Sequence, residues 1–418
     1  MTVIMNSKQL IGNLWVFLTI MSTQAFFYNT GFAQVRPTQS RLNAVAIQGF
    51  YELLETTDIT LVESDSDGRP WQVLILASVD ASPKRVFDVI ADVSNYPKVL
   101  QSVSSSKVLK RNRGMELSSW ALNVPVLGLK GKRAMRPQSP RVIEFRGVSG
   151  HFKQHRERWE IYPHSSPNRA IVAMYRSVDL KKNGGFLLKT LLTLEPSIEH
   201  GMYAAASFVQ LEDFRRYLEK KPKAKPGKHK GPMPSFQEKL SSKKLQTLLP
   251  LLMRGEVTLI YSNDDGSFKQ STVLTVVNAS REKVIAIAHN ADKYPEFVPN
   301  LERYKLKKSD KGYNVIDYEI DLPLMNVEGL MKMKIGTSQS VAMDALEGDI
   351  ERGKWLWTFG SLTEEVTIIS HYSYVDITKA SWFISKLVEI QPLFEHGSVT
   401  ALSMVQVRAI KERCEGKR

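Results

Sequence analysis

The sequence predicts an α+β protein in which one domain occurs twice, each copy a curved antiparallel sheet with a long C-terminal helix. The first observation is a repeat: a shift of 198 residues aligns the two halves of the 418-residue chain without a gap over 47–150. With this shift Tyr96-Pro97 aligns with Tyr294-Pro295. The second is the element order in each copy, where strands follow one another without intervening helices and a long helix comes last. Because solenoid repeats have shorter periods, this repeat indicates duplication of a whole domain.

Each copy begins with two extended segments and a short helix. Residues 58–63 alternate as a strand does, and the turn signal at 65–68 leads to a second extended run, 71–79. Ser82-Pro83 predicts a helix start, because serine is a favourable N-cap and proline is favoured at the first helical position. That helix stops before Tyr96-Pro97, where a short helical turn is expected.

An antiparallel run of strands and a long helix complete the copy. Strands are expected near 105–111, 115–124, 129–136, 141–147, 152–162 and 169–180. Within them Ile143 and Phe145 face one way, and Glu144 and Arg146 the other. The final helix is expected to begin at Pro196, and its apolar stripe recurs in both copies at equivalent positions: Phe208, Leu211, Phe214 and Leu218, then Met404, Val407, Ile410 and Cys414.

The net charge of +14 is spread unevenly. The first domain, 45–219, and the second, 248–415, are joined by a Lys- and Pro-rich linker, 220–247, with nine Lys against one Glu. Its first part, 220–230, should be extended and solvated, and it could contact an anionic membrane surface. A nucleic-acid partner is not expected, since there is no RNP-like aromatic motif and the N-terminus predicts export.

The N-terminal residues 1–33 are predicted to be a signal peptide. An apolar stretch, 11–21, precedes Gly31-Phe32-Ala33, whose small residues suit cleavage near Ala33. We expect an exported protein, periplasmic or secreted; an uncleaved anchor is the alternative, although the apolar run is short for a membrane span. No cysteine lies near this site, so a lipoprotein is excluded. The single cysteine, Cys414, cannot form an intramolecular disulfide and is predicted to pack as a small apolar residue.

Two segments carry a resemblance to a known family, VDASPKRVFDVIADVSNYP at 79–97 and VNASREKVIAIAHNADKYP at 277–295. They resemble the START-like (SRPBCC) superfamily with its helix-grip fold, and within it the polyketide cyclase/dehydrase and coenzyme Q-binding group. The shared pattern is a strand, a helix entered at serine, and a D-x-x-x-Y-P turn; Asn290 replaces the aspartate in the second copy. The resemblance implies a cavity between sheet and C-terminal helix for an apolar molecule such as a lipid, sterol, quinone or polyketide.

The candidate cavity-lining residues are inward-facing aromatic residues and methionines, which either line a pocket or simply fill a core. They are Trp120, Phe145, Trp159 and Phe208 in the first copy, and Tyr318, Met343, Trp357 and Met404 in the second. Four polar residues at the start of the long helices are predicted at the cavity rim, with a purely structural role as the alternative: Glu199, His200, Glu395 and His396. Adjacent helical residues point in different directions, which disfavours a catalytic pair.

Three functions fit the sequence. The favoured one is an exported, non-enzymatic carrier of a hydrophobic molecule, because no pair of reactive groups has a workable spacing. The alternatives are a cyclase, aromatase or dehydratase acting on a polyketide-like chain, and a surface-interaction protein with filled cavities. No metal-binding or phosphate-binding motif is present, so no metal or cofactor is expected.

Overall fold

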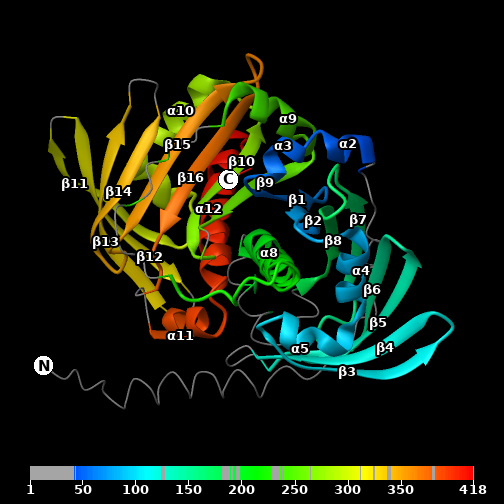
Figure 1. Ribbon diagram of the computed structural model, residues 1–418. Helices are drawn as coiled ribbons and strands as arrows, with labels where there is room; N and C mark the ends of the chain where they lie inside the picture. Colours follow the sequence, from blue (N-terminus) through cyan, green and yellow to red (C-terminus); the bar gives the residue numbers. More distant parts are fainter. Residues whose placement is uncertain are drawn as a thin grey trace, which may run out of the picture. The chain divides into compact units, whose positions relative to one another are not determined.

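The strands of the two repeats join into one sheet in the computed structural model (Figure 1). Among the described residues, 16 strands follow the order β11-β12-β13-β14-β15-β16-β10-β9-β1-β2-β8-β7-β6-β5-β4-β3. The structure describes residues 42, 44–123, 128–180, 189, 192, 193, 198–227, 233, 236, 240–263, 265–310, 312–322, 325–336, 340–378 and 382–417. The predicted signal peptide, 1–33, and the expected helix start at Pro196 lie outside them. No helix in the described part of the chain is long and apolar enough to cross a membrane.

Repeat one contains every strand that the sequence predicts, with ends shifted by a few residues. Its first helix begins after Ser82, whose hydroxyl accepts a hydrogen bond from the backbone N–H of Arg85 at 3.4 Å. Its elements are α2 (Ala44–Gln48), α3 (Tyr51–Leu54), β1 (Asp58–Ser64), β2 (Pro70–Val79), α4 (Pro83–Ala91), η1 (Val93–Asn95), α5 (Tyr96–Val99), β3 (Val103–Asn112), β4 (Met115–Leu122), β5 (Lys130–Ser139), β6 (Val142–Gly150), β7 (Arg156–Pro163), β8 (Ala170–Ser177) and α8 (Ile198–Leu218).

Repeat two has the same order of strands, and a helix lies between its last strand and its long C-terminal helix. Residues 221–227 of the predicted linker have no regular secondary structure, but a helix begins at Ser242, inside the span assigned to the linker. The elements of repeat two are α9 (Ser242–Leu252), β9 (Gly255–Ser262), β10 (Phe268–Val277), α10 (Arg281–His289), η2 (Ala291–Glu296), β11 (Leu301–Asp310), β12 (Tyr313–Leu322), β13 (Met325–Ile335), β14 (Val341–Gly348), β15 (Gly353–Ser361), β16 (Thr367–Val375), α11 (Trp382–Ile390) and α12 (Phe394–Cys414).

The two repeats meet at an antiparallel pair formed by β1 and β9. Thr60 lies directly opposite Thr258, its own counterpart in the other repeat, and Ile59 and Leu61 lie opposite Leu259 and Val257. An approximate twofold axis therefore passes through the Thr60–Thr258 pair. On one face of this junction α3 and α9 cover an apolar core built from both repeats, with Leu53, Leu251 and Leu61 among its residues.

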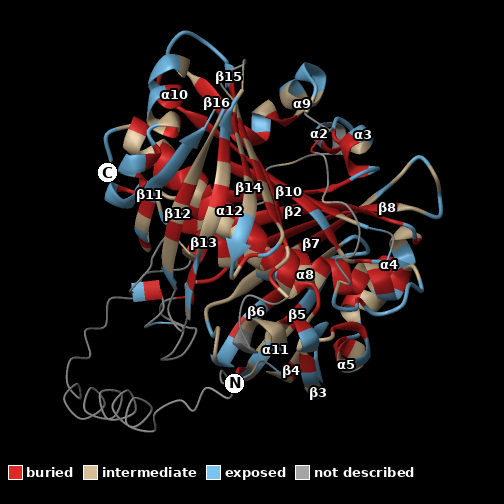
Figure 2. Ribbon diagram, turned by 90° about the vertical axis from the view of Figure 1, so that its left-hand side faces the viewer, coloured by how far each residue is buried: buried red, intermediate tan, exposed pale blue. Residues whose placement is uncertain are grey.

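On the opposite face the long helices α8 and α12 cross in contact with each other. Both are largely buried where they face the sheet (Figure 2). The crossing is close because glycine faces alanine twice: a Cβ atom added to Gly201 would overlap Ala401, and one added to Gly397 would overlap Ala205. Small residues at such positions allow two helix backbones to approach. The glycine of the repeated Glu-His-Gly sequence thus serves helix packing.

Each long helix also contacts the first hairpin of the other repeat. Arg408 on α12 donates to the carbonyl oxygen of Gly68 at 3.1 Å and forms an ion pair with Glu256 at 2.9 Å. Arg216 on α8 donates to the carbonyl oxygen of Asp265 at 3.4 Å. Together with the shared sheet and the shared core, these contacts make the two repeats one structural unit.

Candidate functional site

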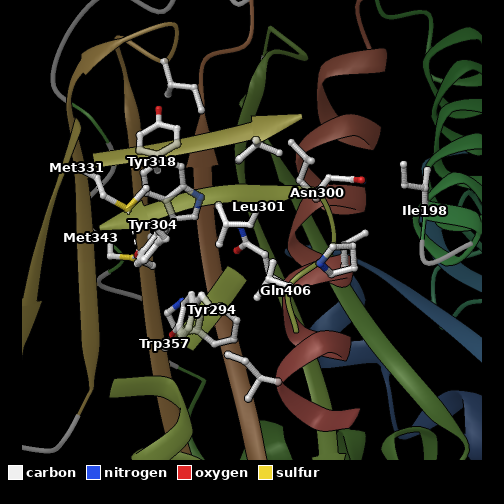
Figure 3. A pocket seen from close by; sticks show the side chains of 18 residues that line it. Ile198, Tyr294, Asn300, Leu301, Tyr304, Tyr318, Met331, Met343, Trp357 and Gln406 are labelled. Atoms are coloured by element: carbon white, nitrogen blue, oxygen red, sulfur yellow. Dashed lines mark hydrogen bonds between the residues drawn. The ribbon is translucent and has the colours of Figure 1, made fainter. Parts of the chain in front are cut away.

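A cavity lies between the sheet and helix α12 in repeat two (Figure 3). The volume open to the centre of a water molecule in this cavity is about 90 Å³. One water molecule needs about 10–15 Å³ on the same measure. Its walls are formed by the strands β11 to β15, the turn after α10, and the inner side of α12. These walls are predominantly aromatic and aliphatic, as expected of a site for an apolar molecule.

Tyr294, from the Tyr-Pro turn, forms one wall. Its hydroxyl donates to the carbonyl oxygen of Ala288 at 2.6 Å, which fixes the turn against the end of α10. Its ring stacks on Tyr304 with centroids 5.1 Å apart. Burial raises the pKa of Tyr294 well above its usual range. Tyr96 makes the same bond in repeat one, to Ile90 at 2.7 Å, so this tyrosine of the family pattern holds the turn in both copies.

One tyrosine and two methionines, from β11, β13 and β14, line a second wall. The hydroxyl of Tyr304 lies 3.4 Å from the sulfur atoms of both Met331 and Met343, and Figure 3 shows the three side chains together on one side of the cavity. Burial raises the pKa of Tyr304 as well. Thioether sulfur accepts only weak hydrogen bonds, so this wall is soft and polarizable.

Two buried polar atoms of the lining have no hydrogen-bond partner among the described residues. They are the hydroxyl oxygen of Tyr318 and the indole nitrogen of Trp357, each in a side chain about 1% exposed. The Trp357 ring stacks on His371 of β16 at 4.0 Å, and both ring nitrogens of His371 also lack partners. Both lining atoms are hydrogen-bond donors, so they can bind a polar group that enters the cavity.

Three partly exposed residues lie along one side of the cavity. Asn300 comes from the loop before β11, Gln406 from α12, and Ile198 from the first turn of α8 in repeat one. Figure 3 shows Ile198 on a helix separate from the one that carries Gln406. Repeat one therefore contributes to the boundary of the cavity in repeat two.

The structure places three of the four residues predicted for repeat two in this lining: Tyr318, Met343 and Trp357. Their role in ligand binding stays a prediction. The prediction for Met404 is wrong, because it lies about 200° around α12 from Leu402, which faces the cavity. Met404 is fully buried in the core instead. Sequence reasoning missed Tyr294, Tyr304 and Met331, although Tyr294 belongs to the family pattern.

The four residues predicted for repeat one lie in other surroundings. Trp159 packs edge-on against Phe214 at 5.3 Å, and Phe145 lies in the same core. Trp120 is half-buried and stacks on Phe152 at 6.0 Å. Phe208 stacks on His396 of α12 at 5.3 Å and so belongs to the contact between the two long helices.

A buried ionic network occupies the interior of repeat one. Arg176 on β8 pairs with Glu157 on β7 at 2.9 Å, and His155 lies 3.3 Å from the same carboxylate. Gln210 on α8 donates to Glu157 at 3.0 Å and also contacts Arg176, while the Trp159 indole donates to Glu157 at 2.5 Å. Burial alone would raise the pKa of Glu157, but these partners, Arg176 first, hold it well below its usual range.

Repeat two has different residues at the equivalent positions. The paired strands align Glu157 and Arg176 with Trp355 and Ser373. Gly353 stands where repeat one has His155. Because Trp355 replaces Glu157, Trp357 lacks the carboxylate that its counterpart Trp159 binds. This difference is visible in the aligned sequences as ionisable residues against uncharged ones at inward positions.

The predicted rim position of the Glu-His pairs is wrong. Glu199, His200, Glu395 and His396 are each at most 4% exposed and lie at the helix crossing, because the glycine after each pair brings α8 and α12 together. His200 lies 3.0 Å from the Ser64 hydroxyl, and His396 lies 3.1 Å from Ser262, in matching bonds. Burial, with the charge of Arg408, lowers the pKa of His200 well below its usual range.

Cys414 is buried, as predicted, and burial raises the pKa of its thiol to about 11. Within the described ranges no group of three or more His, Cys, Asp or Glu side chains could hold a metal ion.

Comparison with known families agrees with this architecture. Residues 79–216 match the family model described as polyketide cyclase / dehydrase and lipid transport. The match runs from the end of β2 to near the end of α8, and repeat two has the same element order. The fold is thus a duplicated helix-grip domain, of which the first copy carries the family match. The family indicates a hydrophobic or lipid-like small molecule as ligand, whether it is bound, transported or converted.

Several solved structures are similar to this chain. The di-domain ARO/CYC StfQ from the steffimycin biosynthetic pathway is 13% identical, with 82% of this chain and 98% of that chain covered and a TM-score of 0.30. A START superfamily protein from Mycobacterium smegmatis is 16% identical, with coverages of 36% and 98% and a TM-score of 0.30. The STAR-related lipid transfer protein from Xanthomonas axonopodis is 14% identical, with coverages of 38% and 93% and a TM-score of 0.30. A search of curated proteins gave no match.

Proposed function

We propose that this protein binds and carries one hydrophobic small molecule per chain in the cavity of repeat two, and that it is not an enzyme. The observation that carries the proposal is the lining itself, where tyrosine, tryptophan, methionine and aliphatic side chains enclose a space between sheet and helix. An apolar molecule gains free energy when it leaves water for such a space.

The chemistry of the lining supports binding over catalysis. Among the described lining residues there is no carboxylate, imidazole, amine or thiol. The ionisable groups are tyrosines, and burial, with a smaller contribution from the charge of Asp349, raises the pKa of Tyr318 to about 12. These hydroxyls stay protonated at neutral pH, so they can donate hydrogen bonds but are poor bases.

The unpartnered donors support a ligand with an oxygen acceptor. The Tyr318 hydroxyl and the Trp357 indole N–H can each donate to a carbonyl or hydroxyl oxygen. Lipids, quinones and polyketides all carry such oxygens on an otherwise apolar body. We assign the ligand to this chemical class.

The enzymatic alternative, a cyclase, aromatase or dehydratase, would have its reactive groups in repeat one, where His155 and Glu157 are close. Their environment counts against it. Glu157 is held ionised by Arg176 and is therefore a weak base, and burial lowers the pKa of His155 despite the contact with Glu157. A structural ionic network accounts for all of these contacts.

The test is native mass spectrometry and organic extraction of the protein purified from its own host, followed by titration with N-phenylnaphthylamine, an uncharged apolar fluorophore. We expect one extracted molecule per chain. The Val405→Trp variant places a large ring in the cavity and should weaken fluorophore binding at least tenfold. Val209→Trp, at the equivalent position of α8, is the matched control and should leave binding unchanged. An apo protein that binds no fluorophore would overturn the proposal.

We also propose that the protein is exported, with cleavage near Ala33, and that the basic segment 220–230 contacts anionic membrane surfaces. The apolar run 11–21 with small residues before Gln34 supports export. N-terminal sequencing of the protein from host fractions tests it: a chain that starts at Gln34 outside the cytoplasm is the expected result, and an intact N-terminus in the cytoplasm would contradict it.

A further inference from the structure

Rows of cations cross the outer face of the sheet in repeat one. In the strand register Lys107 lies opposite Ser119, and Ser119 lies opposite Lys132. A second row runs from Lys110 through Leu117 and Ala134 to Arg146. Side chains alternate between the faces of a sheet, so these residues point away from the interior that holds Phe145. The residues between the cations are mostly small, which leaves the charged side chains accessible.

These cations have almost no acidic neighbours. Residues 103–153 contain eleven Lys and Arg but only two Asp and Glu. Both acids are already engaged, Glu116 with Arg111 at 2.7 Å and Glu144 with Arg158 at 2.6 Å. Lys107, Lys110 and Lys132 are exposed and form no ion pair with another residue of the described ranges.

Exposed apolar side chains stand among the cations. Leu109 is 48% exposed at the register shift between Val108 and Lys110, and Val148 is 50% exposed at the shift opposite Lys132 and Arg133. A β-bulge pushes its extra residue out of the regular ladder. The face therefore combines unpaired positive charge with aliphatic groups that project from it.

The equivalent face of repeat two has the opposite character. Residues 301–351 contain seven Lys and Arg against ten Asp and Glu. Arg303 bridges Asp317 at 3.0 Å and Glu328 at 3.4 Å, so part of the negative charge is neutralised within the face. The difference cannot come from the fold, because both faces are built from the same strands in the same order.

We propose that the outer face of strands β3 to β6 in repeat one docks on an anionic lipid bilayer. Each lysine or arginine near such a surface is attracted by the negative lipid head groups, and the projecting aliphatic groups can enter the interfacial region. The proposal goes beyond the cavity of repeat two and does not depend on which ligand that cavity holds.

Other anionic partners fit the face less well. Single-stranded nucleic acid is bound by stacking on exposed aromatic rings, and the outward positions of the two cation rows carry none. A second copy of the chain would have to offer its acidic face, but the carboxylates Asp317 and Glu328 there are already paired with Arg303.

The experiment is vesicle flotation of the whole chain with phosphatidylcholine alone and with added phosphatidylglycerol. We expect binding only to the anionic vesicles and a loss of binding at high salt, because salt screens exposed charges. Charge reversal by Lys107→Glu with Lys110→Glu should lower the partition coefficient at least ~10-fold. Lys305→Glu with Lys308→Glu makes the same change at the equivalent positions of repeat two and should have a much smaller effect.

Three results would overturn the proposal. One is no binding of the unchanged protein to anionic vesicles. Another is an equal loss from both double variants, which would show a general charge effect. The third is a full loss from Lys221→Glu with Lys223→Glu in the linker and none from the sheet variant. Circular dichroism and thermal unfolding check that each variant is folded, and a gel-shift assay with RNA and gel filtration identify nucleic acid or a second copy as the partner instead.

Discussion

The interiors of the two repeats share one backbone plan and differ in chemistry. In repeat one, Glu157 and Arg176 lead a buried ionic network. In repeat two, Trp355 and Ser373 occupy the same places, and a cavity lined by aromatic and sulfur-containing side chains lies beside them. The fold therefore does not dictate what lies between its sheet and helix. Most of the difference in content comes from residues that differ between the repeats.

The residues that the repeats share are those that build the scaffold. Ser82 and Ser280 begin equivalent helices with the same hydroxyl cap. Tyr96 and Tyr294 donate to the carbonyl at the end of that helix. Gly201 allows the helix crossing, as its counterpart Gly397 does. Each of these contacts involves backbone atoms or a close approach, which few other residue types could satisfy.

The largest expected effect comes from changing one member of the ionic network to its repeat-two residue. Arg176→Ser leaves Glu157 buried without its guanidinium partner, and we expect the free energy of unfolding to fall by about 3–5 kcal/mol. Urea denaturation measures this. The double variant Glu157→Trp with Arg176→Ser installs the repeat-two pair and should recover most of the loss. If the double variant is as unstable as the single one, the network is not the cause.

The same pair predicts a pH dependence. Because the pKa of Glu157 is lowered in the folded state, its contribution is present above the unfolded pKa and is lost as pH falls through the folded pKa. In Arg176→Ser that folded pKa rises towards or above the unfolded value, so a fall in pH through the unfolded pKa should cost the variant less stability than it costs the unchanged protein. Identical pH profiles for the two proteins would count against this assignment.

A smaller effect tests a feature in which the repeats agree. Gly201→Ala and Gly397→Ala each place a methyl group against the facing alanine, and we expect each to cost about 1–3 kcal/mol of unfolding free energy. Gly360→Ala is the control, since a Cβ there meets no atom within 4 Å. If only one of the two variants lost stability, the two glycine–alanine contacts would not be energetically equivalent, although their geometry is alike.

The last effect, which is the smallest at neutral pH and grows on acidification, concerns His371, where repeat one has Met174. Burial lowers the pKa of His371 to about 3, whereas an unfolded histidine binds a proton near 6.5. The unfolded state therefore gains protons first, and His371 costs about 1.4 kcal/mol of stability for each pH unit below about 6.5. His371→Met should remove this slope between pH 6.5 and pH 4. Parallel curves for the variant and the unchanged protein would contradict the prediction.

Local patterns predicted the elements of the fold well. The alternation around Ile143 and the Ser82-Pro83 start each led to an element within a few residues of the observed one. The pairing of β1 with β9 was not foreseen, because strands of alternating character do not reveal which distant strand they join. The role of Gly201 was missed for a similar reason, since it depends on a facing helix 200 residues away in sequence.

The site was predictable only in part. Inward-facing residues of repeat two, such as Tyr318 and Trp357, were identified by strand alternation and do line the cavity. The alternation of side chains along a strand predicts which face of the sheet a residue lies on. It does not predict whether neighbouring side chains fill the space beside that residue. Repeat one shows the difference: Trp159 has the same inward position as Trp357, yet Glu157 and Gln210 pack around it.

The Thr60–Thr258 pair lies on the approximate twofold axis that relates the two repeats within one chain. Two separate copies of a single repeat, joined through the same strand, would form an isologous dimer in which every substitution appears on both sides of the axis. A charged interior would then always face another charged interior, and a cavity another cavity. In one continuous chain each side can change alone, so this molecule combines a half with a buried ionic network and a half with a cavity.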